Sequence, residues 1–217
     1  MDARRTIEMI ISEGIIAIMR ADSSEQLLAA ADAIRAGGLH VIEVTMTTPG
    51  ALDIVREATH AYGSAVAFGV GSVLDAETAR AAILAGAHFV VSPTLSARTV
   101  EVCRRYSVPV IPGALSPTEI LAAWEMGADA VKVFPASLGG PAYFKGIKAP
   151  LPQIRLVAVG GVDSSNTTDF IRAGADAVGV GSALVSSELL RRGDFSAITE
   201  RARGLVRSVA AARQASV

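Results

Sequence analysis

The sequence is poor in cysteine, with Cys103 as the only one among 217 residues. A single thiol can form neither an intrachain disulfide nor a thiolate metal cluster, and such sparse use of cysteine suits a reducing cytosol. Cys103 lies near Val100 and Val102 in an expected helix, which favours a buried packing role over a nucleophilic one. We therefore expect a cytoplasmic protein without disulfides.

An excess of charge and a long apolar segment are also lacking. Lys and Arg number 20 against 21 Asp and Glu, so there is no basic excess to bind a polyanion such as nucleic acid. The first apolar stretch is broken by Glu8, Glu13 and Gly14, which excludes the core of a signal peptide. No later segment reaches the roughly 18 uninterrupted apolar residues that a membrane span needs. We expect a soluble protein that binds neither nucleic acid nor membrane.

Short apolar runs alternate with alanine-rich helical patterns along the chain. The runs predict eight buried parallel strands, at Ile15–Met19, Val41–Thr45, Ala65–Gly69, Phe89–Val91, Val108–Ile111, Ala130–Phe134, Leu156–Val159 and Ala177–Val180. Helices are predicted between them, for example at Ser24–Ala36, Ala76–Ala85, Pro117–Met126 and Asn166–Ala173. Several helices follow a residue of the N-cap type, namely Ser23, Asp75, Ser96, Ser116 and Asp163.

Eight strand–helix units in a chain of this length predict one α/β domain over residues 1–217, a (β/α)8 TIM barrel. An open doubly wound sheet is the alternative, but no G-x-G-x-x-G follows the first strand. A repeated turn supports the barrel. The segments 36–41, 85–90, 126–131 and 173–178 each read as a helix end, a left-handed glycine, a short turn and a buried strand. They precede the second, fourth, sixth and eighth strands.

Lys132 lies within the apolar strand that ends at Phe134. Burying an ammonium group is costly, so a lysine in this setting tends to lose its proton, with pKa depressions of up to ~3–5 units. A neutral amine is a nucleophile toward carbonyl carbon, which indicates Schiff-base chemistry. The alternative is a lysine that pairs with a carboxylate or reaches solvent.

Glu43 is the second ionisable residue inside an apolar strand. Active sites of this barrel lie at the C-terminal ends of the strands, where Glu43 and Lys132 are both expected. The pair could simply neutralise two buried charges. We favour the functional interpretation, in which Glu43 transfers protons for Lys132, because iminium chemistry needs an amine and a carboxylate side by side.

Glycine-rich turns follow the last two strands. Gly160-Gly161 and Gly181-Ser182 lie in the loops where this fold commonly binds phosphate, and bare glycines let an anion approach backbone N–H groups. The alternative is that these glycines only end the strands. We predict phosphate binding there, with Ser182 opening a helix.

No metal or organic cofactor is expected. His40 and His88 fall in turns at the N-terminal ends of strands, away from the predicted site, and His60 lies near a helix end. No two histidines are placed to share a metal ion with an acidic residue.

Several motifs together resemble one enzyme family. They are Glu43-Val44-Thr45, Gly71-Ser72-Val73-Leu74, Val91-Ser92-Pro93, Ile111-Pro112-Gly113, Lys132-Val133-Phe134-Pro135 and Val159-Gly160-Gly161-Val162. In this order they are similar to those of the 2-keto-3-deoxy-6-phosphogluconate (KDPG) / 4-hydroxy-2-oxoglutarate (KHG) aldolases, class I enzymes on a (β/α)8 barrel. The family is commonly homotrimeric, so the resemblance implies a homotrimer.

The resemblance implies a role for each matched residue. Lys132 matches the Schiff-base lysine, and Glu43 matches the general acid/base. The substrate-binding set is Arg20, Thr47, Ser72, Pro93 and Phe134, and the phosphate-binding set is Gly160, Gly161, Gly181 and Ser182. Three positions depart from well-known members: Thr47 replaces an arginine that contacts the carboxylate, and Ser72 and Val159 each replace a threonine.

The implied reaction cleaves KDPG, a small 2-keto acid sugar phosphate, to pyruvate and glyceraldehyde 3-phosphate. KHG, which yields pyruvate and glyoxylate, is a possible second substrate. One alternative is the galactonate-derived epimer of KDPG (KDPGal). Another is a phosphate-binding barrel isomerase or synthase that uses Lys132 only as a charge, and a third is a phosphosugar-binding protein without activity.

Overall fold

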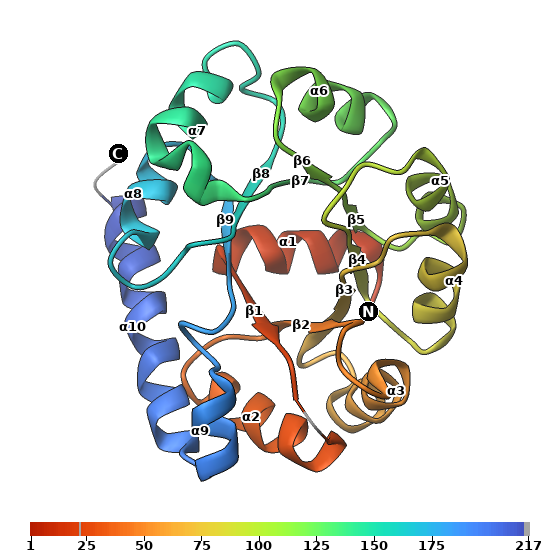
Figure 1. The fold of residues 1–217 in the computed structure, drawn as a ribbon, viewed down its shortest axis with the longest axis vertical. Coiled ribbons are helices and arrows are strands. Elements are labelled where there is room, and N and C mark those ends of the chain that lie inside the picture. The colour runs from red at the N-terminus through yellow and green to blue at the C-terminus, as the bar shows by residue number, and fades with distance from the viewer. Residues whose placement is uncertain (22, 215–217) are drawn as a thin grey trace.

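The computed structural model describes residues 1–21 and 23–214, which form a ring of parallel strands surrounded by helices (Figure 1). The strands are β1 (Ile15–Met19), β2 (Val41–Thr45), β3 (Ala67–Gly71), β4 (Phe89–Val91), β5 (Val110–Ile111), β6 (Gly113–Ala114), β7 (Val131–Val133), β8 (Leu156–Val159) and β9 (Ala177–Val180). The helices are α1 (Ala3–Glu13), α2 (Ser24–Ala36), α3 (Ala51–Tyr62), α4 (Ala76–Leu84), α5 (Ala97–Arg105), α6 (Pro117–Glu125), η1 (Ala136–Leu138), α7 (Gly140–Lys148), α8 (Thr167–Arg172), α9 (Ser187–Arg192) and α10 (Phe195–Gln214). No described helix is both long and apolar enough to cross a membrane.

The strand order β5-β4-β3-β2-β1-β9-β8-β7-β6 confirms the predicted barrel. The predicted fifth strand is divided into β5 and β6 by Pro112, which has no N–H to donate to a neighbouring strand. The carbonyl of Pro112 still accepts a hydrogen bond from the Lys132 N–H at 2.9 Å. The two short strands therefore complete the ring between β4 and β7.

Alternate residues of each strand face two separate cores. Side chains that face outward, such as Ile42 and Val44 on β2, pack under the surrounding helices. Those that face inward, such as Ile16, Val41 and Phe89, fill the barrel together with Ile10 of α1. Figure 1 shows α1 lying across the middle of the ring, so this helix closes the N-terminal end of the barrel.

The third strand begins two residues later than predicted, at Ala67. The backbone leaves α3 through Gly63 and turns, with the Ala65 N–H donating to the carbonyl of Tyr62. The later start carries β3 through to Gly71, next to the candidate site.

Two helix starts also differ from the prediction. Asp163 does not cap α8, because that helix begins at Thr167 and its N-cap residue is Asn166. The Asp163 carboxylate instead accepts hydrogen bonds from the N–H and hydroxyl of Ser165 within the loop. Ser182 lies in a turn rather than at a helix start, since α9 begins at Ser187 with Ser186 as its cap.

Candidate active site

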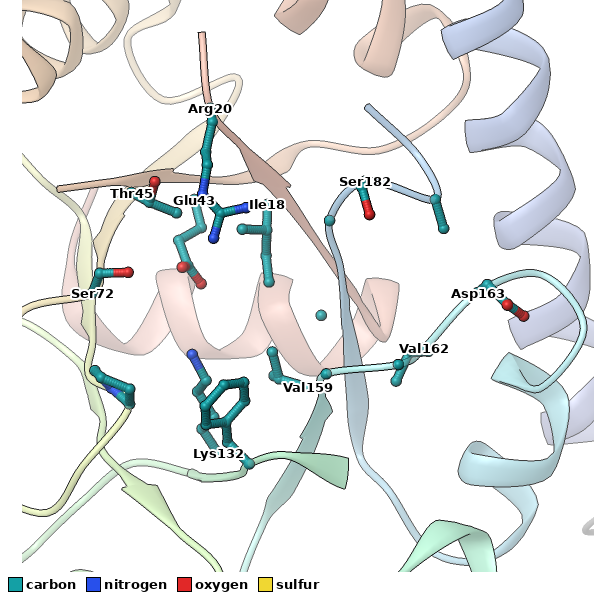
Figure 2. A pocket seen from close by; sticks show the side chains of 17 residues that line it. Ile18, Arg20, Glu43, Thr45, Ser72, Lys132, Val159, Val162, Asp163 and Ser182 are labelled. Atoms are coloured by element: carbon teal, nitrogen blue, oxygen red, sulfur yellow. The ribbon is translucent and has the colours of Figure 1, made fainter. Parts of the chain in front are cut away.

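A cavity of about 380 Å³ opens at the C-terminal ends of the strands. It is lined by Ile18, Arg20, Glu43, Thr45, Ser72, Pro93, Lys132, Phe134, Val159, Gly160, Gly161, Val162, Asp163, Gly179, Gly181, Ser182 and Ala183. Its walls come from most of the barrel strands and their following loops, as the fold requires of an active site. Figure 2 shows the side chains that face it.

Lys132 extends into this cavity from the middle of β7. Its side chain lies inward because it is one residue from Val131 and Val133, which face the helical layer. Only 6% of the residue is exposed, and the Nζ atom lies 4.8 Å from the centre of the Phe134 ring. Burial lowers the pKa of the Lys132 amine, and the positive charge of Arg20 lowers it further, whereas Glu43 opposes the shift. The environment therefore shifts the Lys132 amine toward its neutral form.

Glu43 faces Lys132 across the cavity (Figure 2). It is 2% exposed and lies on β2, opposite Ile18 of β1 and Gly69 of β3. Burial raises the pKa of the Glu43 carboxyl, and the charges of Lys132 and Arg20 partly offset that rise. The two shifts bring an acid and an amine toward neutral forms that can exchange protons.

Gly71 makes the room that the Glu43 carboxyl occupies. A Cβ atom built on Gly71 would lie 1.7 Å from Glu43 Oε1, closer than any real contact. The backbone at this position therefore has to be glycine for Glu43 to keep its orientation.

Arg20 and Thr47 were both predicted to bind substrate, but the structure places them differently. Arg20 lines the cavity, whereas Thr47 is exposed and lies outside the lining. The two are joined by a hydrogen bond from Arg20 Nε to Thr47 Oγ1 at 3.3 Å. Thr47 Oγ1 also lies 2.8 Å from the hydroxyl oxygen of Thr45, which does line the cavity.

The other three residues of the predicted substrate-binding set reach the same cavity. Ser72, Pro93 and Phe134 line it, and Phe134 covers the Lys132 amine. Ser72 has a φ of 60°, an uncommon value for a residue with a side chain. Such backbone outliers concentrate at functional sites.

The predicted phosphate-binding residues form the other end of the cavity. Gly160 and Gly161 have φ values of 94° and 77°, which a side chain would rarely allow. A Cβ atom on Gly161 would also lie 2.7 Å from the Cβ of Ser137. Gly181 and Ser182 line the cavity beside them. These four residues therefore line one cavity together, as predicted.

The sequence analysis did not identify several lining residues. Ile18 could have been found, since it lies on β1 two positions after Ile16, which also faces into the barrel. Asp163 and Ala183 lie in loops, where no periodicity shows which side chains face the cavity. Among the described residues, no group of three or more His, Cys, Asp or Glu side chains could hold a metal ion.

Comparisons with known proteins give the chain similarity to one family. The sequence model of an aldolase family, described as KDPG and KHG aldolase, matches residues 7–201. The chain is 36% identical over 186 residues to 2-dehydro-3-deoxy-phosphogluconate aldolase of Treponema pallidum, covering 85% of this chain and 88% of that one. It is 34% identical over 171 residues to 2-dehydro-3-deoxy-6-phosphogalactonate aldolase of Escherichia coli, covering 78% of this chain and 83% of that one.

A solved structure gives the same likeness in three dimensions. The KDPG aldolase of Legionella pneumophila, captured with pyruvate as a covalent carbinolamine intermediate, superposes with a TM-score of 0.86. The two chains are 28% identical, and the match covers 92% of this chain and 97% of that one.

Proposed function

Because the chain belongs to the KDPG and KHG aldolase family and is therefore a carbon–carbon lyase, we propose that it cleaves KDPG through a Schiff base on Lys132. The observation that carries this proposal is the pair formed by a buried lysine and a buried glutamate facing one cavity. The carbinolamine captured in the Legionella enzyme supports covalent chemistry with pyruvate.

The cleavage begins at Lys132. Its neutral amine adds to the C2 ketone, and loss of water gives an iminium that can accept the electrons of the breaking bond. Glu43, directly or through a water molecule, takes the proton of the C4 hydroxyl as the C3–C4 bond breaks and the aldehyde forms. Glu43 then returns a proton to C3 of the enamine. Hydrolysis of the resulting iminium releases pyruvate and restores the amine.

The glycine-rich end of the cavity supports a phosphorylated substrate. Backbone N–H groups near Gly160, Gly161 and Gly181 can approach an anion closely, and the Ser182 hydroxyl can donate a hydrogen bond to it. We therefore propose glyceraldehyde 3-phosphate as the aldehyde product. KHG, with glyoxylate as its aldehyde product, is proposed as a second substrate.

A specific observation also favours KDPGal as a candidate substrate. The relative that acts on 2-dehydro-3-deoxy-6-phosphogalactonate is almost as similar to this chain as the phosphogluconate aldolase of Treponema pallidum. KDPG and KDPGal differ only in configuration at C4, the carbon that carries the hydroxyl whose proton Glu43 is proposed to take. The homotrimer implied by the family resemblance and the cytoplasmic location expected from the sequence stay predictions.

Borohydride trapping tests the proposed function. After incubation with pyruvate and borohydride, peptide mass spectrometry is expected to find one reduced adduct, on Lys132. Lys132→Ala should abolish both the adduct and the release of pyruvate from KDPG. Glu43→Gln should keep the lysine but slow turnover by ~10²–10⁴-fold. Comparing the release of pyruvate from KDPG, KDPGal and KHG then ranks the substrates.

A folded wild-type protein without any adduct would contradict the Schiff base. Lys132 would then act only as a charge, as in a phosphate-binding isomerase or synthase. Ligand binding without any pyruvate release would indicate a phosphosugar-binding protein.

A further inference from the structure

Thr47 lies outside the cavity but is hydrogen-bonded to the arginine that lines it. Its Oγ1 accepts from Arg20 Nε at 3.3 Å and lies 2.8 Å from Thr45 Oγ1. A guanidinium group can only donate, so the Thr47 oxygen accepts from Arg20 and its own proton is available for Thr45. Thr45 is 1% exposed and ends β2. The barrel wall thus anchors this short chain of hydrogen bonds.

This arrangement determines how Arg20 presents its charge. Thr47 engages the Nε atom, on one edge of the planar guanidinium. Figure 2 shows the rest of the guanidinium extending into the cavity beside Glu43. The two terminal nitrogens of an arginine form a fork that matches the two oxygens of a carboxylate. A guanidinium held in one orientation binds such a group with a smaller loss of side-chain entropy.

The position of Arg20 indicates which anionic group of the substrate it meets. Among the described residues that line the cavity, only Arg20 and Lys132 carry cationic groups, and Lys132 is taken up by the covalent bond. The charge of Arg20 acts on both Glu43 and Lys132. In a keto acid bound to Lys132 through C2, the carboxylate is on the adjacent carbon, whereas a C6 phosphate lies four carbons away. In Figure 2 the Arg20 guanidinium lies beside Glu43 on the left of the view, whereas Ser182, Val162 and Asp163 lie on the right.

We propose that Thr47 is a positioning residue which, together with Thr45, orients Arg20 to bind the carboxylate of the pyruvyl group. This inference rests on the proposed function, because it requires a keto acid on Lys132. It leaves the far phosphate to the backbone N–H groups of the glycine-rich loops.

The test uses pyruvate, which has a carboxylate but no phosphate. The rate of borohydride labelling of Lys132 is measured against pyruvate concentration in the wild type, Arg20→Ala, Thr47→Val, Thr47→Ser and the Arg20→Ala/Thr47→Val double variant. Thr47→Val removes the hydroxyl at nearly constant side-chain volume, whereas Thr47→Ser keeps the hydroxyl and removes only the methyl group. The KM for glyceraldehyde 3-phosphate is measured for the same proteins in the condensation direction. Thermal melting confirms that each variant is folded.

Thr47→Val is expected to raise the half-saturating pyruvate concentration roughly 5- to 10-fold, with a smaller change in the maximal labelling rate. Thr47→Ser keeps the hydroxyl, so its half-saturating pyruvate concentration should stay close to the wild-type value. In the Arg20→Ala background, Thr47→Val should change the half-saturating pyruvate concentration by less than about 2-fold. A residue that acts through Arg20 has no effect when Arg20 is absent.

Three results would overturn the proposal. In the first, the half-saturating pyruvate concentration of Thr47→Val equals that of the wild type. In the second, Thr47→Val has the same effect with and without Arg20. In the third, Arg20→Ala raises the KM for glyceraldehyde 3-phosphate and leaves the dependence on pyruvate unchanged. A wild-type protein that pyruvate never labels would refute the proposed function as well, so the two failures are distinguishable.

Discussion

At the scale of single residues, Gly71 limits where the Glu43 carboxyl can lie, and Glu43 is the proposed acid–base group. We predict that Gly71→Ala lowers kcat for pyruvate release by ~10²-fold or more, because the added methyl group occupies the place of Glu43 Oε1. Adding Gly71→Ala to Glu43→Gln should cause little further loss, since both changes disable the same group. Gly146→Ala is the matched control, because a Cβ at this position in α7 meets nothing within 4 Å. A wild-type kcat in Gly71→Ala would contradict the positioning role of the glycine.

The residues that sequence could identify are those whose chemistry conflicts with their surroundings. Lys132 and Glu43 stand out because charges in apolar strands are costly, and both are buried in the cavity. Thr47 was placed by resemblance among the substrate-binding residues, but it lies outside the lining. A hydroxyl on a loop carries no periodicity, so its hydrogen bond to Arg20 could not be predicted from the sequence.

At the scale of elements, the repeated turns before β2, β4, β7 and β9 have a shared function in the barrel. Each contains a glycine with positive φ, at Gly38, Gly86, Gly127 and Gly174, as the sequence predicted. At the three later turns, a side chain accepts a backbone N–H from the start of a strand. The acceptors are His88 for Phe68, Asp129 for Val110 and Asp176 for Leu156. At the first turn, Glu13 accepts the N–H of His40. The repeat was visible in the sequence, but these pairings depend on neighbouring strands and were not.

His88 should make the stability of the barrel depend on pH. Its Nδ1 accepts the Phe68 N–H at 3.1 Å, which requires a neutral ring, and burial lowers the pKa of His88 to about 4. The unfolded chain, with a His88 pKa near 6.5, binds a proton first as pH falls. The contribution of His88 to stability is therefore complete above about pH 6.5 and is lost between pH 6.5 and 4.

Urea unfolding of wild type and His88→Asn across this range measures the effect. The asparagine Oδ1 can accept the same N–H but does not titrate. We expect the wild type to lose about 1–2 kcal/mol relative to this variant between pH 7 and 4, a value reduced for partial solvent exposure. His60→Asn, at an exposed histidine of α3, is the control. Parallel pH profiles for wild type and His88→Asn would show that His88 does not titrate in this way.

At the scale of the whole molecule, the last helix holds the first one in place. Arg213 of α10 donates to the carbonyls of Ser12 and Ile11, at 2.5 and 2.6 Å, and to that of Asp176 at 3.3 Å. These bonds satisfy carbonyl groups at the C-terminal end of α1, where helices leave them unpaired. The sequence analysis predicted neither this contact nor α1. The helix is amphipathic, but the sequence does not show that a barrel end lies beneath its apolar face.

Arg213→Met is expected to lower the free energy of unfolding by about 1–3 kcal/mol, because it leaves these carbonyls without their charged donor. Chemical denaturation of this variant and of Arg207→Met, an exposed arginine earlier in α10, gives the comparison. An equal loss of unfolding free energy in both variants would show that the hydrogen bonds between α10 and α1 make no specific contribution to stability. The rate of pyruvate release at low temperature should remain that of the wild type, since Arg213 lies outside the lining of the cavity.

The closure of one barrel end by α1 also bears on the order of the reaction steps. With Ile7 and Ile10 packed into the lower end, the mouth beside Arg20 and Ser182 is the natural route for substrate and for both products. In the proposed mechanism the pyruvyl group stays covalently attached to Lys132 when the C3–C4 bond breaks. The aldehyde is therefore expected to be the first product to leave. In the condensation direction the proposed mechanism is ordered, because pyruvate has to form the Schiff base before the aldehyde can react. We therefore expect an aldehyde that occupies the cavity first to inhibit the reaction.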